Sequence, residues 1–287
     1  MSTLSTRRSY LTGTTVALCV AVAGCFGFGS DEEHDHPDYT KWVAESMASD
    51  RLTVTRRLPS VELELGGSDE YELFGISIAD IDVYLSVDTP LPADGVTNGL
   101  SVLEAEFDAD ELAETLTGDQ YGLVADGDVD GYARYVDPDE ADEPDGERSV
   151  VAVDADAGRI LSPRRSEWFD AAREAYEGDR TRLVEADRDF SLVTREAGVS
   201  HLTFAHHPGE RLDAESIAYT NTFEGDDPSY DLREVYAFDG QTAAENAADE
   251  MRSGYDIVED LEISVEDRIV VLMGHVPDGE RPDETGE

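Results

Sequence analysis

Lysine is almost absent from this chain of 287 residues, in which Lys41 is the single example. Basic side chains are scarce as a class, because 21 Lys and Arg oppose 67 Asp and Glu and give a formal net charge of −46 at pH 7. Such a surface is repelled by nucleic acid and by anionic lipid, so charge-driven binding to either is excluded. The balance favours a protein adapted to molar salt, where the Debye length falls to about 3 Å and self-repulsion is screened.

No apolar run is long enough to cross a bilayer. The longest run, Leu11–Gly24, has about 14 residues, whereas a spanning helix needs about 20. Its flanks are those of an export signal, since Arg7 and Arg8 precede it and no acidic residue occurs before Asp31. A buried helix or a membrane span is the alternative, and the same flanks argue against it.

The paired arginines Arg7 and Arg8 resemble a twin-arginine export signal, and Val22–Cys25 resembles a lipobox, in which the cysteine becomes the lipidated first residue of the mature chain. The resemblance implies a lipid anchor on Cys25 at the extracellular face of the cell membrane. Cys19 lies in the segment that is removed, so no free thiol remains. Disulfides, thiolate metal sites and cysteine catalysis are then excluded.

Taken with the acidic, lysine-poor composition, this N-terminus resembles the exported lipoproteins of extremely halophilic archaea. The alternative is an acidic, partly disordered protein from a mesophile. Hydrophobic residues make up 40% of the chain and follow regular patterns, which argues against disorder.

The chain divides into four parts on composition. Residues 1–24 form the signal peptide, and residues 25–38 form a lipidated, acidic tether without apolar periodicity. Residues 39–276 are long enough for a domain with a real core, and residues 277–287 form a polar tail.

Strand patterns dominate the ectodomain. The run Val61–Leu65 alternates strictly, Ile76–Val87 places apolar residues at alternate positions, and Ser149–Val153 with Arg159–Leu161 forms a hairpin pattern. Helical spacing is found in Pro37–Asp50 and from Pro163 to about Tyr176. We expect an α+β fold with a mainly antiparallel sheet and helices on one of its faces.

Two segments share an order of elements. Leu100–Asp137 and Leu232–His275 each predict a strand, a short acidic helix, a tyrosine-led strand and a closing strand. This pattern favours a degenerate pseudo-repeat. Convergent patterning of α and β elements is the alternative that the low identity leaves open.

The stretch Tyr121–Phe204 resembles exported proteins of the domain-of-unknown-function kind found in archaea and actinobacteria. The resemblance rests on a displayed strand pair, an alanine-containing helix and the Asp187-Arg-Asp189-Phe190 stretch before another strand. It supports the architecture and implies no activity, cofactor or catalytic residue.

A calcium loop is one interpretation of the acidic segment after Val124. Asp126, Asp128 and Asp130 precede Gly131, and Asp137 occupies the twelfth position, as in loops that wrap a hard cation. The twelfth residue of such loops is normally the longer Glu, and Asp-Gly is also a common hairpin turn. We favour the hairpin and keep the four aspartates as metal-ligand candidates.

His206 and His207 invite a metal or general-base interpretation. Adjacent residues of a strand point to opposite faces, so surface imidazoles at a strand end are the favoured interpretation. No catalytic or cofactor motif occurs in the sequence, and no cofactor is predicted.

Three functions remain. The leading one is a non-enzymatic lipoprotein that binds a ligand or acts as an accessory to a membrane or envelope protein. The alternatives are a calcium- or metal-stabilised envelope domain and an extracellular hydrolase that uses carboxylates or the two histidines.

Overall fold

The computed structural model describes residues 36–48, 52–58, 72–89, 98–144, 147–207, 212–223, 229–255 and 257–277. Predictions for Arg7, Arg8, Cys25 and the strand Val61–Leu65 lie outside these residues.

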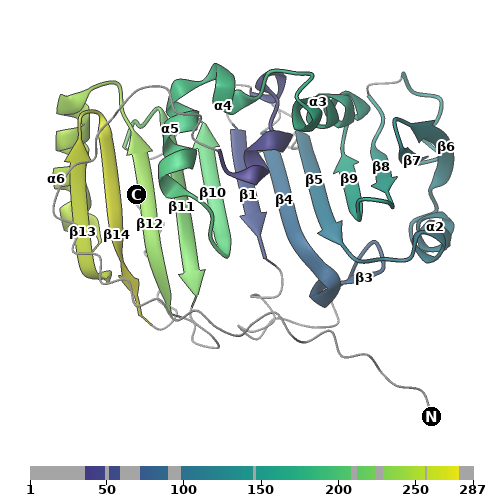
Figure 1. The fold of residues 1–287 in the computed structure, drawn as a ribbon, viewed down its shortest axis with the longest axis horizontal. Helices are drawn as coiled ribbons and strands as arrows, with labels where there is room; N and C mark the ends of the chain where they lie inside the picture. The colour runs from purple at the N-terminus through teal and green to yellow at the C-terminus, as the bar shows by residue number, and fades with distance from the viewer. Residues whose placement is uncertain are drawn as a thin grey trace, which may run out of the picture. The chain divides into compact units, whose positions relative to one another are not determined.

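A sheet of twelve strands organises the fold, with the order β13-β14-β12-β11-β10-β1-β4-β5-β9-β8-β7-β6 (Figure 1). All of its pairings are antiparallel, which confirms a mainly antiparallel α+β fold. Its strands are β1 (Leu52–Arg57), β4 (Ile81–Thr89), β5 (Asn98–Ala105), β6 (Val124–Val129), β7 (Tyr132–Val136), β8 (Val150–Asp154), β9 (Arg159–Pro163), β10 (Leu202–His207), β11 (Ser216–Phe223), β12 (Tyr230–Ala237), β13 (Glu259–Glu266) and β14 (Ile269–Val276). A separate small hairpin pairs β2 (Glu72–Leu73) with β3 (Ile76–Ser77).

The helical elements of the described residues are α2 (Ala109–Thr117), α3 (Ser166–Glu177), α4 (Leu183–Ala186), α5 (Arg188–Ala197) and α6 (Gln241–Gly254), with 3₁₀ turns η1 (Asp38–Trp42), η2 (Glu45–Met47) and η3 (Ile78–Asp80). Two of the helices begin at an aspartate whose carboxylate accepts two backbone N–H bonds, Asp108 at α2 and Asp187 at α5. Such caps satisfy donors that the first helical turn leaves unpaired.

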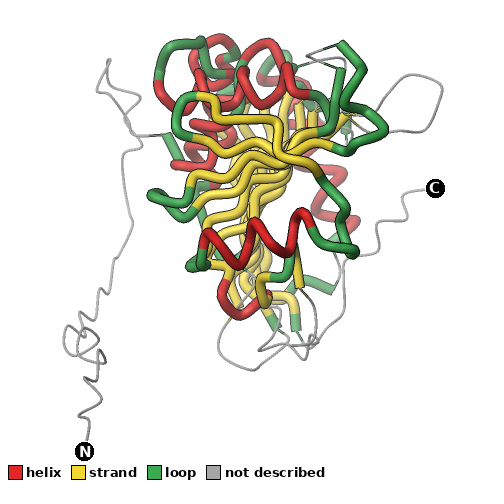
Figure 2. Tube along the Cα trace, turned by 90° about the vertical axis from the view of Figure 1, so that its right-hand side faces the viewer, coloured by secondary structure: helices red, strands yellow, loops and turns green. Residues whose placement is uncertain are grey.

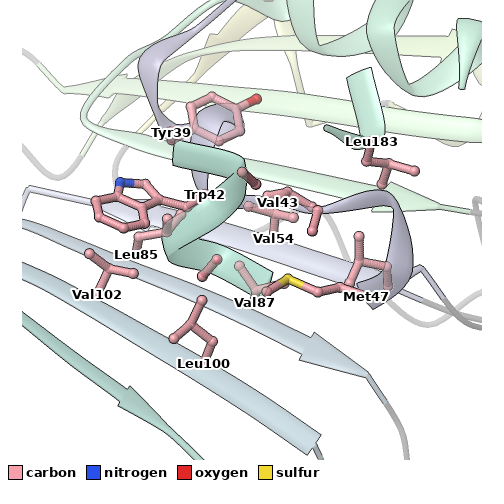
Figure 3. Packing of buried hydrophobic residues seen from close by; sticks show 14 of the residues in the cluster. Tyr39, Trp42, Val43, Met47, Val54, Leu85, Val87, Leu100, Val102 and Leu183 are labelled. Atoms are coloured by element: carbon pink, nitrogen blue, oxygen red, sulfur yellow. The ribbon is translucent and has the colours of Figure 1, made fainter. Parts of the chain in front are cut away.

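One face of the sheet packs against α3, α4, α5 and the η1–η2 segment. Phe169 and Phe190 of these helices are fully buried in the same cluster as Val54 and Leu85 of the strands. Figure 3 shows side chains of the η1–η2 segment against apolar side chains of β1, β4 and β5. Trp42 also stacks on Tyr176 of α3, with ring centroids 4.1 Å apart.

Helices also cover the opposite face, so the prediction of helices on one face is wrong. On β12, Val235 packs in the α5 cluster, while its neighbour Tyr236 packs with α6 in a second cluster. A third cluster joins Leu112 and Leu116 of α2 to the same face as Tyr236. Figure 2 shows helical segments on both sides of the strands. The cause is visible in runs such as Ile269–Leu272, which are apolar at consecutive positions and therefore bury both faces.

The expected helix over Pro37–Asp50 is instead the pair of turns η1 and η2. Between them the chain is extended at Val43 and Ala44, and Ala44 forms a β-bridge to Arg182. The backbone N–H of Leu183 also donates to the carbonyl of Val43 at 2.8 Å. This distant pairing overrides the local helical spacing.

The two expected tyrosine-led strands start later than predicted, β6 at Val124 and β13 at Glu259. Both segments of the expected pseudo-repeat have the order strand–helix–strand–strand. Their pairing differs, because β12 lies next to β14, whereas β5 lies next to β9 and is separated from β7. The repeat therefore stays a prediction.

Candidate functional site

The expected calcium loop is a β-hairpin between β6 and β7. Val129 pairs with Tyr132, and Asp130 and Gly131 between them have φ of 49° and 89°. Positive φ at both central residues is the geometry that favours Asp-Gly in two-residue hairpin turns. The hairpin interpretation is confirmed.

The four aspartates of that segment serve different partners. Asp126 lies 3.1 Å from the Arg134 guanidinium and 3.4 Å from that of Arg148, and Asp130 lies 3.1 Å from Arg173 of α3. Asp137 accepts a hydrogen bond from the backbone of the residue two positions on, and Asp128 is exposed. Within the described residues, no three His, Cys, Asp or Glu side chains group closely enough to hold a metal ion. The pair between Asp130 and Arg173 joins the hairpin to α3, whereas Asp126 pairs with Arg134 of β7 and with Arg148 in the loop before β8.

His206 and His207 point to opposite faces, as predicted. The Nδ1 atom of His206 lies 3.1 Å from the Thr53 hydroxyl, on the face away from α5. His207 faces α5, where its Nδ1 lies 2.9 Å from the Ser216 hydroxyl and its Nε2 lies 3.5 Å from the Asp187 carboxylate.

Ser216, His207 and Asp187 have the residue types of a serine-hydrolase triad, but their arrangement is structural. Ser216 is completely buried, so its hydroxyl is closed to a substrate. The hydroxyl contacts Nδ1 and the carboxylate faces Nε2, the reverse of the order in which a triad orients its base. Asp187 also caps α5. These contacts join β10 and β11 to the start of α5.

Two other described histidines, His201 and His275, have local partners. His201 accepts a hydrogen bond from the Phe223 backbone at 3.0 Å, and His275 lies 3.0 Å from Asp231. Neither brings a second imidazole to His206 or His207.

A hollow of about 580 Å³ lies where β4, β5 and the β8–β9 turn meet. Carboxylates dominate its wall, and its single basic residue, Arg159, is bound to the Tyr176 hydroxyl at 2.6 Å. The Arg159 guanidinium also lies over the Tyr176 ring, 4.5 Å from its centroid. Arg159 thus serves packing, and its Nε also lies 3.6 Å from the Glu104 carboxylate.

On the side of the sheet that carries α2 and α6, the clusters around these two helices contain no described residue of the central strands β1 and β10. We call this surface the central face. Across β11, β10, β1, β4 and β5 it consists of three rows of directly paired residues. The first row is Tyr219, Phe204, Thr55, Ser86 and Ser101; the second is Ile217, His206, Thr53, Asp88 and Gly99; the third is Asn221, Leu202, Arg57, Tyr84 and Leu103.

Aromatic rings gather at one side of the central face. Phe204 and Tyr219 stack with centroids 4.6 Å apart and planes at 20°, and His206 stacks on Tyr219 at 5.9 Å. All three rings are half-buried. Tyr219 also packs against the cluster around α6, and Ile217 and Leu103 of the rows are buried in the α6 and α2 clusters, so helices cover both ends of the central face.

Hydroxyl groups occupy the other side of the central face. Ser86 and Ser101 follow Thr55 in the first row, and the Tyr84 phenol lies 3.2 Å from the Ser101 hydroxyl. Ser86, Ser101 and Tyr84 are half-buried, whereas Thr55 is buried.

Asp88 is the acid of this surface. Partial burial raises the pKa of Asp88. A hydrogen bond from Ser86 and the charge of Arg164 lower it, but their effect is smaller than that of burial. Gly99 lies beside it, and a Cβ at position 99 would come within 2.8 Å of the Asp88 carboxylate. Glycine at 99 therefore leaves the space in which the carboxylate sits.

Of the central face, only His206 was singled out from the sequence, as a metal or general-base candidate. A signal was present, because runs such as Leu52–Thr55 and Ile217–Phe223 alternate apolar residues with Thr, Tyr and Asn in a chain that elsewhere uses Asp and Glu. Which strands are neighbours depends on long-range pairing, which the pattern does not contain.

Comparison with solved structures finds chains of similar fold. The structure titled "Structure of crystal form I of TP0453" matches with a TM-score of 0.50 and 9% sequence identity, over 85% of this chain and 95% of that chain. At this identity the likeness shows the fold alone. No protein-family model matches the chain, and no curated protein matches it. No helix in the described part of the chain is long and apolar enough to cross a membrane.

Proposed function

We propose that this protein is a lipoprotein of a halophilic archaeon, exported by the twin-arginine route and anchored through Cys25 at the extracellular face of the membrane, where it binds a ligand without catalysis. The observation that carries the binding role is the central face, with half-buried aromatic rings and hydroxyls between the parts of the sheet that α2 and α6 cover. The Arg7-Arg8 pair and the small residues before Cys25 support the anchoring.

The anchoring is tested by fractionating cells of a halophilic archaeal host that expresses the full chain. Cys25→Ser should move the protein from the membrane fraction to the medium. Cys19→Ser is the matched control, because Cys19 lies in the segment that the signal peptidase removes, and this variant should stay in the membrane. Retention of the Cys25→Ser protein on the membrane would refute lipidation at that residue.

The export route is tested separately. Arg7→Lys combined with Arg8→Lys keeps the charge but removes the paired arginines, so we expect precursor to accumulate inside the cell. Normal amounts of mature protein outside the cell would contradict the twin-arginine route.

The hydrolase and calcium alternatives have less support. Ser216 is buried, and the guanidiniums of Arg134, Arg148 and Arg173 already pair with Asp126 and Asp130. If calcium nevertheless binds the hairpin, calcium added in molar KCl will raise the melting temperature, and Asp128→Ala will abolish the increase. Without a bound ion, neither calcium nor Asp128→Ala has such an effect.

We also infer that Leu100–Asp137 and Leu232–His275 descend from one duplicated unit. The shared strand–helix–strand–strand order supports this origin, and insertion of the β8–β9 hairpin between β5 and β7 accounts for the different pairing. Superposition of β12–α6–β13–β14 on β5–α2–β6–β7 tests it. Helices that cross their strands in opposite directions would contradict a duplication.

A further inference from the structure

The methionines of the described residues differ sharply in exposure. Met47 and Met251 are each 2% exposed and lie in two of the apolar clusters, whereas Met273 of β14 is 36% exposed. Figure 3 shows the Met47 side chain among apolar residues of the sheet. Oxidants dissolved in water attack methionine according to the access they have to its side chain. In this part of the chain, Met273 is therefore the methionine that a dissolved oxidant reaches.

Met273 lies beside the C-terminal end of α5. It pairs directly with Arg233 of β12, and Val271, two positions earlier on the same face, packs against the cluster that includes α5. The Nε of Arg233 donates to the backbone carbonyl of Glu196, the penultimate residue of α5, at 2.8 Å. Val199, just beyond the helix, is 48% exposed. The cover that α5 gives to this face therefore ends near Met273.

The guanidinium of Arg233 is directed at the sulfur of Met273. Its Nη1 donates a hydrogen bond to Sδ at 3.1 Å, and its Nη2 lies 4.0 Å from the Glu196 carboxylate. A thioether sulfur is a weak acceptor, so this charged donor has a poor partner. Oxidation improves the partner, because methionine sulfoxide is polar and its oxygen carries negative charge.

The oxidation is a two-electron step, written here for hydrogen peroxide. A lone pair of Sδ attacks one peroxide oxygen, the S–O bond forms and the O–O bond breaks. The second oxygen takes the proton of the first and leaves as water, so the sulfur is oxidised and the peroxide is reduced. Because the Arg233 guanidinium covers one side of the Met273 sulfur, peroxide approaches from the other side. Rotation about the flexible Cγ–Sδ bond then turns the new oxygen toward Nη1.

We propose that Met273 is a reversible oxidation site, at which hydrogen peroxide forms methionine sulfoxide and the Arg233 guanidinium binds the sulfoxide oxygen. The oxidised protein stays folded, and a methionine sulfoxide reductase returns the residue to the thioether. The site goes beyond the proposed function and does not depend on it, because neither residue belongs to the central face.

The first measurement is mass spectrometry of the purified full chain after treatment with hydrogen peroxide in molar KCl. Trypsin places Met47, Met251 and Met273 in separate peptides, because basic residues lie between them. Met273 should oxidise about tenfold faster than the other two, or more, in line with its exposure. Met273→Leu is the control, in which the fast oxidation should disappear. A smaller difference between the three rates would overturn the assignment of the site.

The second measurement tests whether Arg233 covers the sulfur. Methionine sulfoxide has two epimers, each reduced by its own reductase. A sulfur covered on one side should give mainly one epimer, so one of the two reductases alone should restore most of Met273. Arg233→Ala uncovers the sulfur and should give nearly equal epimers. Arg195→Ala, which removes another arginine from the same end of α5, is the matched control and should keep the wild-type ratio. A wild-type ratio near one, or a ratio unchanged in Arg233→Ala, would contradict the contact.

The third measurement is the melting temperature in molar KCl before and after oxidation. The wild type should melt at the same temperature or higher once oxidised, because Arg233 donates to the sulfoxide oxygen. A fall of about 2 °C or more would mean that the oxygen lacks this donor. Met273→Gln keeps the test decisive if Arg233→Ala does not fold. Its side-chain carbonyl offers a similar acceptor, so it should melt no lower than Met273→Leu, and a lower value would overturn the role of Arg233.

Discussion

The phenol of Tyr255 donates a hydrogen bond to the carboxylate of Glu234, on the side of the sheet covered by α6. The Tyr236 phenol donates to the same oxygen at 2.5 Å, and all three residues are buried. A buried carboxylate is costly unless hydrogen bonds compensate it. The phenols of Tyr236 in β12 and of Tyr255 at the end of α6 therefore compensate the cost of burying the Glu234 carboxylate. Through this carboxylate they also connect the helix to the strand.

Tyr255→Phe should lower the free energy of unfolding by about 1.5–3 kcal/mol, the usual contribution of a hydrogen bond to a charged group. The measurement is urea unfolding in molar KCl. Tyr121→Phe is the matched control, because the Tyr121 ring packs on Phe74 with a centroid distance of 5.8 Å and phenylalanine keeps that contact. Equal stability of the two variants would show that the Glu234 network contributes little.

Local signals in the sequence predicted several elements of the fold. Asp130-Gly131 identified the β6–β7 hairpin, Asp108 begins α2 where the acidic helix was expected, and the hairpin of β8 and β9 was placed correctly. These features depend on residues close together in the chain. They could therefore be inferred from turn chemistry and periodicity.

The arrangement of faces could not be predicted in the same way. Thr55 pairs with Phe204 and with Ser86, and the central face exists only because those pairings bring β1 between β10 and β4. The helices on both faces depend on consecutive apolar residues, as in Val150–Val153, which resemble a single buried strand but do not indicate what covers each side. Long-range strand pairing determines both the central face and the positions of the helices.

The Asp126 carboxylate faces two guanidiniums that are mostly buried, Arg134 and Arg148. Asp126→Asn removes the compensating charge, so we expect a loss of about 2 kcal/mol, below the 3–5 kcal/mol of a fully buried pair because Asp126 is one-quarter exposed. Asp128→Asn, at an exposed position of the same strand, should stay within about 0.5 kcal/mol of the wild type. The measurement is urea unfolding of the wild type and the two variants. If Asp126→Asn is as stable as the wild type, the ion pairs of Asp126 with Arg134 and Arg148 do not stabilise the fold.

Tyr39 is 5% exposed, and its hydroxyl makes no hydrogen bond with the part of the chain that the structure describes. Burial raises the pKa of this phenol, which therefore remains neutral. Tyr39→Phe removes a polar atom that lacks a partner and keeps the ring, so the free energy of unfolding should rise by up to about 1 kcal/mol. Thermal unfolding in molar KCl measures the change. A lower melting temperature would mean that the phenol has a partner after all.

Asp88 should make stability depend on pH in the opposite sense to a salt-bridged acid. Burial raises its pKa in the fold, so the native state binds this proton more tightly than the unfolded state does. Above the raised pKa the charged carboxylate destabilises the fold, and below the ordinary value near 3.8 both states are protonated and the cost vanishes. Asp88→Asn should therefore stabilise the protein at neutral pH, by less than about 1 kcal/mol.

The measurement for Asp88 is the difference in unfolding free energy between wild type and Asp88→Asn across the acidic range. The advantage of asparagine should shrink as the pH falls toward 3.8. A constant difference would exclude titration of Asp88 as its cause.

Salt should decide whether the domain is folded. With 67 acidic and 21 basic side chains, carboxylates outnumber their possible partners, and at 0.1 M salt the Debye length of about 10 Å lets them repel one another. We expect circular dichroism to show loss of the native sheet signal on dilution from molar to 0.1 M KCl at pH 7. Lowering the pH of the dilute sample to about 4 protonates about half of the carboxyls, and this should restore folding if repulsion between carboxylates causes the unfolding. If the protein needs potassium ions themselves, the dilute sample will stay unfolded at that pH. If instead the fold persists in dilute buffer at pH 7, the main argument for a halophilic origin is removed.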